Sequence, residues 1–144
     1  MTASREGHDE GSSRLKEISS ELEKFQGHIE GVLAQFDYCA AAQFAMRLSL
    51  EEAMMNGFRH GNRQDASKSV EVRWSISSDS ATFHVTDEGE GFDPEAVPDP
   101  TLDENLEIPS GRGLMLIRAY MSEACYHGPG NHLEMTFRKS TPHD

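Results

Sequence analysis

The chain has 144 residues, 36% of them hydrophobic, and a formal net charge of −12 at pH 7. This length accommodates one folded domain with its own core, and not two. The negative charge opposes direct binding to nucleic acid or to an anionic membrane surface, because every approach adds repulsion. A nucleotide can bind only where basic groups, backbone N–H groups or a metal offset its phosphate charge.

The sequence shows no sign of a membrane span, an export signal or a disulfide framework. Charges interrupt the longest apolar stretches, and residues 1–13 lack the apolar segment of a signal peptide. Cys39 and Cys125 lie far apart, without the paired spacing of a zinc site. We therefore expect a cytoplasmic protein in which both cysteines are small packing residues.

The first half of the chain is predicted to form a short strand and two helices. Residues 1–13 are polar and are expected to be a disordered tail before a folded domain of residues 14–140. Residues 14–18 are the expected first strand, and Ser19 or Ser20 caps a helix with apolar residues in steps of three and four. These apolar residues are Leu22, Phe25, Ile29, Val32 or Leu33, and Phe36.

A second helix is expected over residues 39–60, ended by Gly61-Asn62. A heptad-like spacing of apolar residues predicts its buried side. The members of that side are Ala41, Phe44, Ala45, Leu48 and Met55.

The second half is predicted to form a hairpin, a long loop, a helix and a last strand. Residues 69–77 and 81–86 alternate apolar and polar side chains, as strands with one buried face do. Residues 92–110 hold four of the six prolines and are expected to be a surface loop. A helix from Gly113 and a strand over residues 132–139 complete an α+β two-layer sandwich, with helices on one face of a mainly antiparallel, mixed sheet.

Polar residues at helical spacing form the first candidate constellation. Glu52, Asn56 and His60 are four residues apart and share one helix face, with Arg59 beside them. On their own such residues more often mark a solvated face. A functional interpretation assigns the amide oxygen to a Mg²⁺ ion and the carboxylate to a general base for a hydroxyl or water.

The second constellation directly follows a predicted strand. Residues 87–94 read Asp-Glu-Gly-Glu-Gly-Phe-Asp-Pro. Gly89 and Gly91 allow the backbone to approach a ligand closely, and Asp87 can accept a hydrogen bond from an adenine amino group. The alternative is an acidic, glycine-rich turn. It is not a Walker loop, since no Gly-Lys-Ser or Gly-Lys-Thr occurs in the chain.

The third constellation closes the long loop and opens a helix. Gly111, Arg112, Gly113 and Leu114 follow Ser110. Helix N-termini with flexible glycines bind phosphates, and the guanidinium of Arg112 suits a γ-phosphate. The alternative is a loop-to-helix junction with a surface arginine. One binding site would explain all three constellations together.

Taken in order, residues 51–62, 87–94 and 111–117 resemble the N box and the two glycine boxes of the GHKL superfamily, which binds ATP in the Bergerat fold. The pattern is most similar to the small anti-sigma factor serine kinases. The features that carry this likeness are Glu-Ala-x-x-Asn-x-x-x-His-Gly, Gly-Phe-Asp-Pro and Gly-Arg-Gly-Leu. The resemblance covers about residues 15–139, essentially the whole domain.

The resemblance implies a role for most of these residues. Asn56 would ligate the Mg²⁺ that bridges the phosphates, and Glu52 would be the general base that activates a protein serine. Asp87 would read the adenine amino group, with Gly89 and Gly91 shaping its pocket. His60 and Leu114 complete the expected ATP-binding set.

The basic residues and the loop would enclose the phosphates. Arg59 matches a position where related kinases keep a basic residue facing them. Gly111, Arg112 and Gly113 would close a lid of about residues 92–112 over the γ-phosphate. Gly57 departs from the family, which more often has alanine there. Glycine inside a helix costs about 1 kcal/mol of stability relative to alanine. We expect it to permit closer packing behind the pocket.

The resemblance also implies protein partners, namely a sigma factor, or a small anti-anti-sigma protein phosphorylated on serine, and it leaves a homodimer open. An acidic protein should prefer partners with a basic contact surface. Three alternatives remain at this point. They are an ATP-dependent anti-sigma module without catalysis, the ATP-binding half of a histidine kinase acting in trans, and a structural protein without a ligand.

Overall fold

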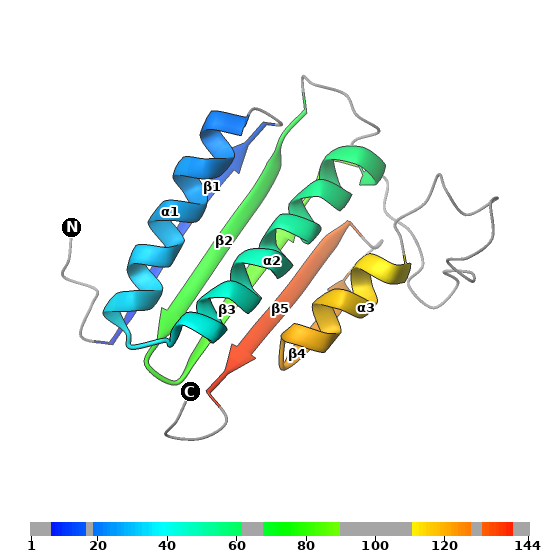
Figure 1. Ribbon diagram of the computed structural model, residues 1–144. Helices are drawn as coiled ribbons and strands as arrows, with labels where there is room; N and C mark the ends of the chain where they lie inside the picture. Colours follow the sequence, from blue (N-terminus) through cyan, green and yellow to red (C-terminus); the bar gives the residue numbers. More distant parts are fainter. Residues whose placement is uncertain (1–6, 17–18, 62–67, 90–110, 128–130, 140–144) are drawn as a thin grey trace.

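The computed structural model describes residues 7–16, 19–61, 68–89, 111–127 and 131–139. Five strands and three α-helices account for most of them (Figure 1). The strands are β1 His8–Leu15, β2 Val70–Ser77, β3 Ser80–Thr86, β4 Glu123–His127 and β5 His132–Arg138. The helices are α1 Ser19–Gln35, α2 Ala40–Asn56 and α3 Gly111–Tyr120, and a π-helical turn, η2 Gly57–Gly61, extends α2.

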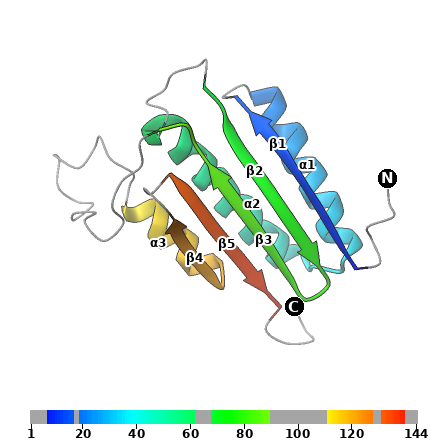
Figure 2. The same cartoon turned by 180° about the vertical axis from the view of Figure 1, so that it is seen from behind.

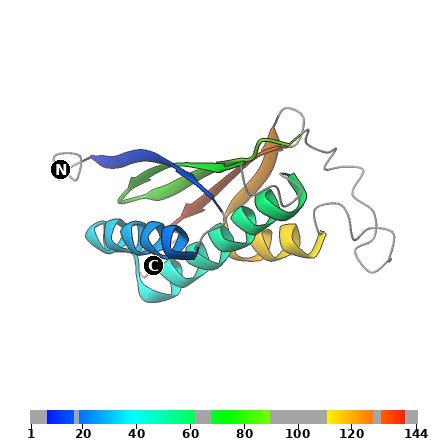
Figure 3. The same ribbon diagram turned by 90° about the horizontal axis from the view of Figure 1, so that it is seen from above.

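The strands form one sheet in the order β1-β2-β3-β5-β4 (Figure 2). Every pairing among these described strands is antiparallel, so the mixed sheet of the prediction contains no parallel pair here. The three helices cover one face of the sheet and leave the other face open (Figure 3). The predicted α+β sandwich is confirmed. None of the described helices is long and apolar enough to cross a membrane.

The core lies between the sheet and the helices, where the predicted alternation of the strands places it. Val70, Val72 and Ile76 of β2 are fully buried, and so is Phe83 of β3. From the helical side, α1, α2 and α3 contribute apolar residues to the same cluster. The fully buried members of these helices are Ile29, Leu33, Met46, Leu50, Met54 and Ile117.

The first strand begins earlier than the sequence predicts. Residues 1–13 were expected to be a disordered tail, but His8–Leu15 pairs with β2 along its whole length. The segment has almost no aliphatic residues, so its hydrophobic pattern gave no strand signal. Backbone pairing and a few side-chain contacts hold it. The indole Nε1 of Trp74 donates to Asp9 Oδ1 at 3.0 Å, Gly11 lies opposite that indole, and Leu15 is buried in the core.

Two expectations about burial are wrong. Ala41 and Phe44 of α2 are exposed, and Phe44 instead packs edge-to-face on Tyr120 of α3, with ring centroids 6.3 Å apart. Because α2 carries apolar residues on several sides, its spacing fits more than one stripe, and packing against the sheet selects the side that includes Ala42, Met46, Leu50 and Ala53. Both cysteines are exposed as well.

The contact between Gly11 and Trp74 gives a test of β1. A Cβ at Gly11 would lie 2.3 Å from Cζ2 of Trp74, so Gly11→Ala must displace the indole or the strand. We expect the free energy of unfolding in urea to fall by about 1–3 kcal/mol, the usual cost of overpacking. Gly7→Ala is the matched control, because nothing lies within 4 Å of its Cβ position. Equal stability of both variants would show that residues 8–13 are a loose tail after all.

Candidate functional site

Two of the three sequence constellations meet at one end of the sandwich. α2 ends there at Asn56, and β3 ends there at Thr86, just before Asp87 (Figure 1). A small cavity of about 20 Å³ lies between them. Its lining consists of Ala53, Asn56, Gly57, Val85, Asp87, Tyr126, Asn131 and Leu133. The structure therefore brings Asn56 and Asp87 to one site, although 31 positions separate them in sequence.

Asn56 is the buried polar residue of this site. Its side chain is only 9% exposed, and its amide nitrogen Nδ2 has no hydrogen-bond acceptor among the described residues. Leaving such a group unpaired costs about 1–3 kcal/mol, so folded proteins rarely retain one without a reason. A polar ligand in the adjoining cavity would remove this cost.

Asp87 is held in place by the residues that follow it. Its Oδ1 accepts a hydrogen bond of 2.7 Å from the backbone N–H of Gly89, which closes a side-chain-to-backbone turn. Burial raises the pKa of the carboxyl, and the Gly89 N–H and the charge of Lys68 oppose that rise in part. The backbone N–H of Gly89 thus orients the carboxyl.

Asn131 belongs to this site and was missed from the sequence. Its Nδ2 donates to the backbone oxygens of Asp87 at 3.3 Å and Gly89 at 3.2 Å, and its own backbone oxygen accepts from the Asp87 N–H at 3.0 Å. These three bonds fasten the chain after β3 to the start of β5. The sequence shows only that this asparagine follows a Gly-Pro-Gly turn. Asparagine is common in turns, so its position did not indicate a role in the site.

Tyr126 of β4 was also missed. Burial raises the pKa of its phenol to about 12, and the negative charges of Asp87 and Glu52 act in the same direction. Tyr126 and Asp87 both line the cavity. Glu52 is half-buried on α2, one turn before Asn56. Tyr126 could not be found from its sequence because β4 has no distinctive motif.

Gly57 has a steric role at this site. A Cβ there would lie 2.9 Å from Cγ2 of Val70 and 3.4 Å from Cβ of Asp87. Val70 is a stiff, fully buried side chain, so it yields little. The glycine therefore allows the end of α2 to approach the sheet closely, as predicted, and this approach sets the separation between Asn56 and Asp87.

The structure describes the two remaining residues of the first constellation, Arg59 and His60, only in part. Arg59 is exposed in η2, and the side chain of His60 lies outside the described residues. From Gly57 the helix continues as a π turn, so the four-residue spacing that aligned Glu52 with Asn56 no longer applies to His60.

The second glycine box opens a helix, as expected, but this helix begins two residues before the predicted start. α3 starts at Gly111 rather than Gly113, so the box forms its first turn. The side chains of Arg112 and Leu114 lie outside the described residues, as does Gly91.

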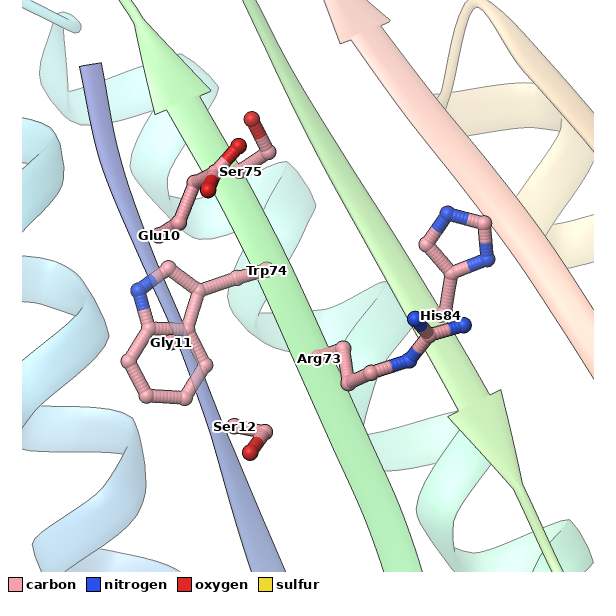
Figure 4. Close-up of a pocket in the computed structure, with 7 residues that line it drawn as sticks. All are labelled: Glu10, Gly11, Ser12, Arg73, Trp74, Ser75 and His84. Atoms are coloured by element: carbon pink, nitrogen blue, oxygen red, sulfur yellow. The ribbon is translucent and has the colours of Figure 1, made fainter.

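A larger hollow of about 520 Å³ lies on the opposite, open face of the sheet (Figure 4). It is lined by Glu10, Gly11, Ser12, Arg73, Trp74, Ser75 and His84. It contains none of the predicted binding residues. Volume alone therefore does not identify the functional site.

Comparison with known proteins places the chain in a family. The sequence model of the histidine kinase-like ATPase domain matches residues 16–137, and the chain belongs to that family. It is similar to serine/threonine-protein kinase BtrW of Bordetella bronchiseptica, with 25% identity over 112 residues, 75% of this chain and 79% of BtrW. It is also similar to serine-protein kinase RsbW of Bacillus subtilis, with 26% identity over 103 residues, 66% of this chain and 63% of RsbW. The family expected from the three boxes is confirmed.

The unpaired amide of Asn56 gives a test that separates binding from folding. Leucine has nearly the same branched shape, so Asn56→Leu should leave the unfolding free energy of the ligand-free protein unchanged or raise it by about 1 kcal/mol. It should at the same time abolish stabilisation by added ATP, which for an intact site amounts to about 2.7 kcal/mol at a hundredfold excess over Kd. Thermal unfolding with and without nucleotide measures both.

The matched control is Ser49→Ala on the same helix. The Ser49 hydroxyl is also fully buried without a partner among the described residues, but it does not line the cavity. This variant should gain stability and keep its response to ATP. If Asn56→Leu instead unfolds more easily, the amide has a structural role.

Proposed function

We propose that this protein is an ATP-binding anti-sigma regulatory factor with serine-protein kinase activity, which phosphorylates a small anti-anti-sigma protein on serine. The observation that carries the proposal is the meeting of Asn56 and Asp87 at one cavity, with Glu52 one helical turn before Asn56. Two relatives named as serine or serine/threonine kinases support the same activity.

The residues at the cavity fit Mg²⁺ and ATP. An asparagine amide offers an oxygen donor to a hard cation. The amide of Asn56 lines the cavity, and its buried Nδ2 has no hydrogen-bond acceptor among the described residues. Bound MgATP would supply the phosphoryl group, with the cation offsetting the phosphate charge.

The cavity must open to admit the base. A space of about 20 Å³ holds one water molecule, and an adenine ring is far larger. Asp87 can then bind the adenine amino group through Oδ2, since Gly89 already occupies Oδ1. In this proposal Gly89 and Gly91 allow the backbone to follow the base closely.

The phosphates would lie towards the start of α3 and the end of α2. The first turn of α3, at Gly111, has backbone N–H groups without intrahelical partners, which favour anions. Arg59 and Arg112 would add positive charge there, and Gly111, Gly113 and Leu114 would form the end of the lid. His60 completes the proposed set.

Glu52 is the proposed general base. It lies about 6 Å along the helix from Asn56, close enough for a serine hydroxyl to sit between its carboxylate and the phosphates. It would take the hydroxyl proton as the serine oxygen attacks the γ-phosphorus. The chain's net charge of −12 favours a partner that presents this serine beside a basic contact surface.

The raised pKa of Asp87 predicts a pH dependence of nucleotide binding. Only the ionised carboxylate accepts bonds from both the Gly89 N–H and the adenine amino group, so affinity should rise as pH increases through the raised pKa. The same ionisation opposes folding, because the pKa of Asp87 is higher in the folded protein than in the unfolded chain. The protonated carboxyl therefore stabilises the folded state fully at a pH below the ordinary pKa of aspartate. This contribution is lost as the pH rises through the pKa of the folded state.

Asp87→Asn removes this titration. The Kd of this variant for ATP, divided by the Kd of the original protein, should increase between about pH 4 and pH 7. The nucleotide's own ionisation affects both proteins equally, so it cancels in this ratio. Isothermal titration calorimetry at several pH values measures it. A ratio that stays constant would mean that Asp87 does not read the base.

Glu52→Gln tests catalysis separately from binding. Loss of a general base lowers phosphoryl transfer by about 10²- to 10⁴-fold, while the Kd for ATP should stay within about threefold. Glu51→Gln is the matched control: it removes the same charge from the adjacent exposed position and should retain full transfer. The measurement is acid-stable phosphate on a purified anti-anti-sigma partner. Full transfer by Glu52→Gln would exclude the base assignment, and no transfer by the unchanged protein would favour a binding module.

A further inference from the structure

We propose that the open face of the sheet carries a transition-metal site, distinct from the nucleotide cavity, that binds a divalent ion of the Zn²⁺ class. Cys125, His127 and Glu134 are its ligands, and His132 supplies the fourth. The ligand atoms of the first three all lie within 4.8 Å of one another. Thiolate, imidazole and carboxylate together form a donor set that zinc and its neighbours bind well.

The antiparallel register produces this cluster. Cys125 and His127 of β4 pair with Glu134 and His132 of β5, and Glu134 pairs on its other side with His84 of β3. Directly paired residues on one face have Cβ atoms about 4.5–5.5 Å apart. On β5 these residues alternate with buried Leu133 and Met135, which face the helices, so the cluster lies on the uncovered side.

The distances fit tetrahedral coordination. His127 Nε2 lies 3.5 Å from Cys125 Sγ and 2.6 Å from Glu134 Oε1. A tetrahedral zinc ion holds nitrogen and sulfur ligands about 3.6 Å apart, and nitrogen and oxygen ligands about 3.3 Å apart, given bonds of about 2.0 Å to N and O and about 2.3 Å to S. The cysteine and histidine thus already have the required separation, and the carboxylate needs to move by less than about 1 Å.

The same geometry argues against a cysteine nucleophile. In a nucleophile–base–acid relay the two ring nitrogens of the histidine contact different partners. Here a single nitrogen, Nε2 of His127, faces both Cys125 Sγ and Glu134 Oε1. Three ligand atoms that converge on one point match the geometry of a metal site.

His84 positions the fourth ligand. Its Nδ1 lies 2.8 Å from Nε2 of His132, so one ring donates a proton to the other and the two cannot both be charged. This contact engages Nε2 of His132 and leaves its Nδ1 as the ring nitrogen available to the ion. A histidine held by an outer hydrogen bond is the usual arrangement of metal ligands.

Cobalt and zinc titrations of the full chain without nucleotide test the site. We expect one equivalent of Zn²⁺ to bind in calorimetry, and Co²⁺ to give a near-ultraviolet thiolate-to-cobalt absorption band. Cys125→Ser should lose the band, and both Cys125→Ser and His127→Ala should bind Zn²⁺ at least about tenfold more weakly. His84→Ala should keep the band and weaken Zn²⁺ binding about 10- to 100-fold, the usual effect of removing an outer partner.

Matched controls replace an exposed cysteine and an exposed histidine that lie outside the cluster. Cys39→Ser and His8→Ala should bind as the unchanged protein does. Cys125 and His127 are exposed, so their variants should fold, which circular dichroism verifies. Asn56→Leu should bind Zn²⁺ normally, which separates this site from the nucleotide cavity. No zinc binding by the unchanged chain, or unaltered binding by Cys125→Ser, would overturn the proposal.

Discussion

The close approach of α2 to the centre of the sheet is the contact on which the rest of the structure depends. Met46 and Leu50 pack into the core with no exposed surface, and Gly57 lets the end of the helix reach Val70 where any Cβ would collide. This approach fixes the distance from Asn56 to Asp87, and with it the cavity between them. A bulkier residue at position 57 would change the site without touching any predicted ligand.

The sheet separates two kinds of chemistry by the direction of its side chains. Towards the helices, β3, β4 and β5 present Val85, Tyr126 and Leu133 to the cavity beside Asn56 and Asp87. Towards solvent, the alternating positions carry histidines, a cysteine and a glutamate. Asn131 and His132 are neighbours in sequence, yet the first fastens Asp87 and the second belongs to the outer cluster.

The sequence predicted those features that rest on local pattern. The alternation of Val70, Val72, Trp74 and Ile76 placed β2 correctly, and residues 51–62 and 87–94 identified the family before any contact was known. The sequence did not predict the features that depend on pairing between distant segments. β1 has no apolar stripe and is held by backbone pairing, which a single-strand pattern does not encode.

The site residues that were missed share the same cause. Tyr126 and Asn131 come from a strand and a turn without a motif, and they reach the cavity only through the β4–β5 register. Paired spacing along the chain also gave no sign that Cys125 lies beside His127 and Glu134. These neighbours share one face of β4 and β5, where alternate side chains point the same way.

Side-chain contacts to backbone oxygens hold the end of the sandwich that lies away from the site. Away from the site, the Tyr38 hydroxyl donates to Ser77 O at 2.9 Å, and Lys139 donates to Phe36 O at 2.7 Å while lying 4.4 Å over the Tyr38 ring. These bonds join α1, β2 and the end of β5.

At the other end, the structure retains an unpaired amide at Asn56 and a buried carboxyl at Asp87, and both oppose folding. A domain stabilised by only about 5–15 kcal/mol can keep such groups only if other contacts offset them. The contacts around Tyr38 are among those that offset them, and so are the three bonds by which Asn131 fastens Asp87 and Gly89.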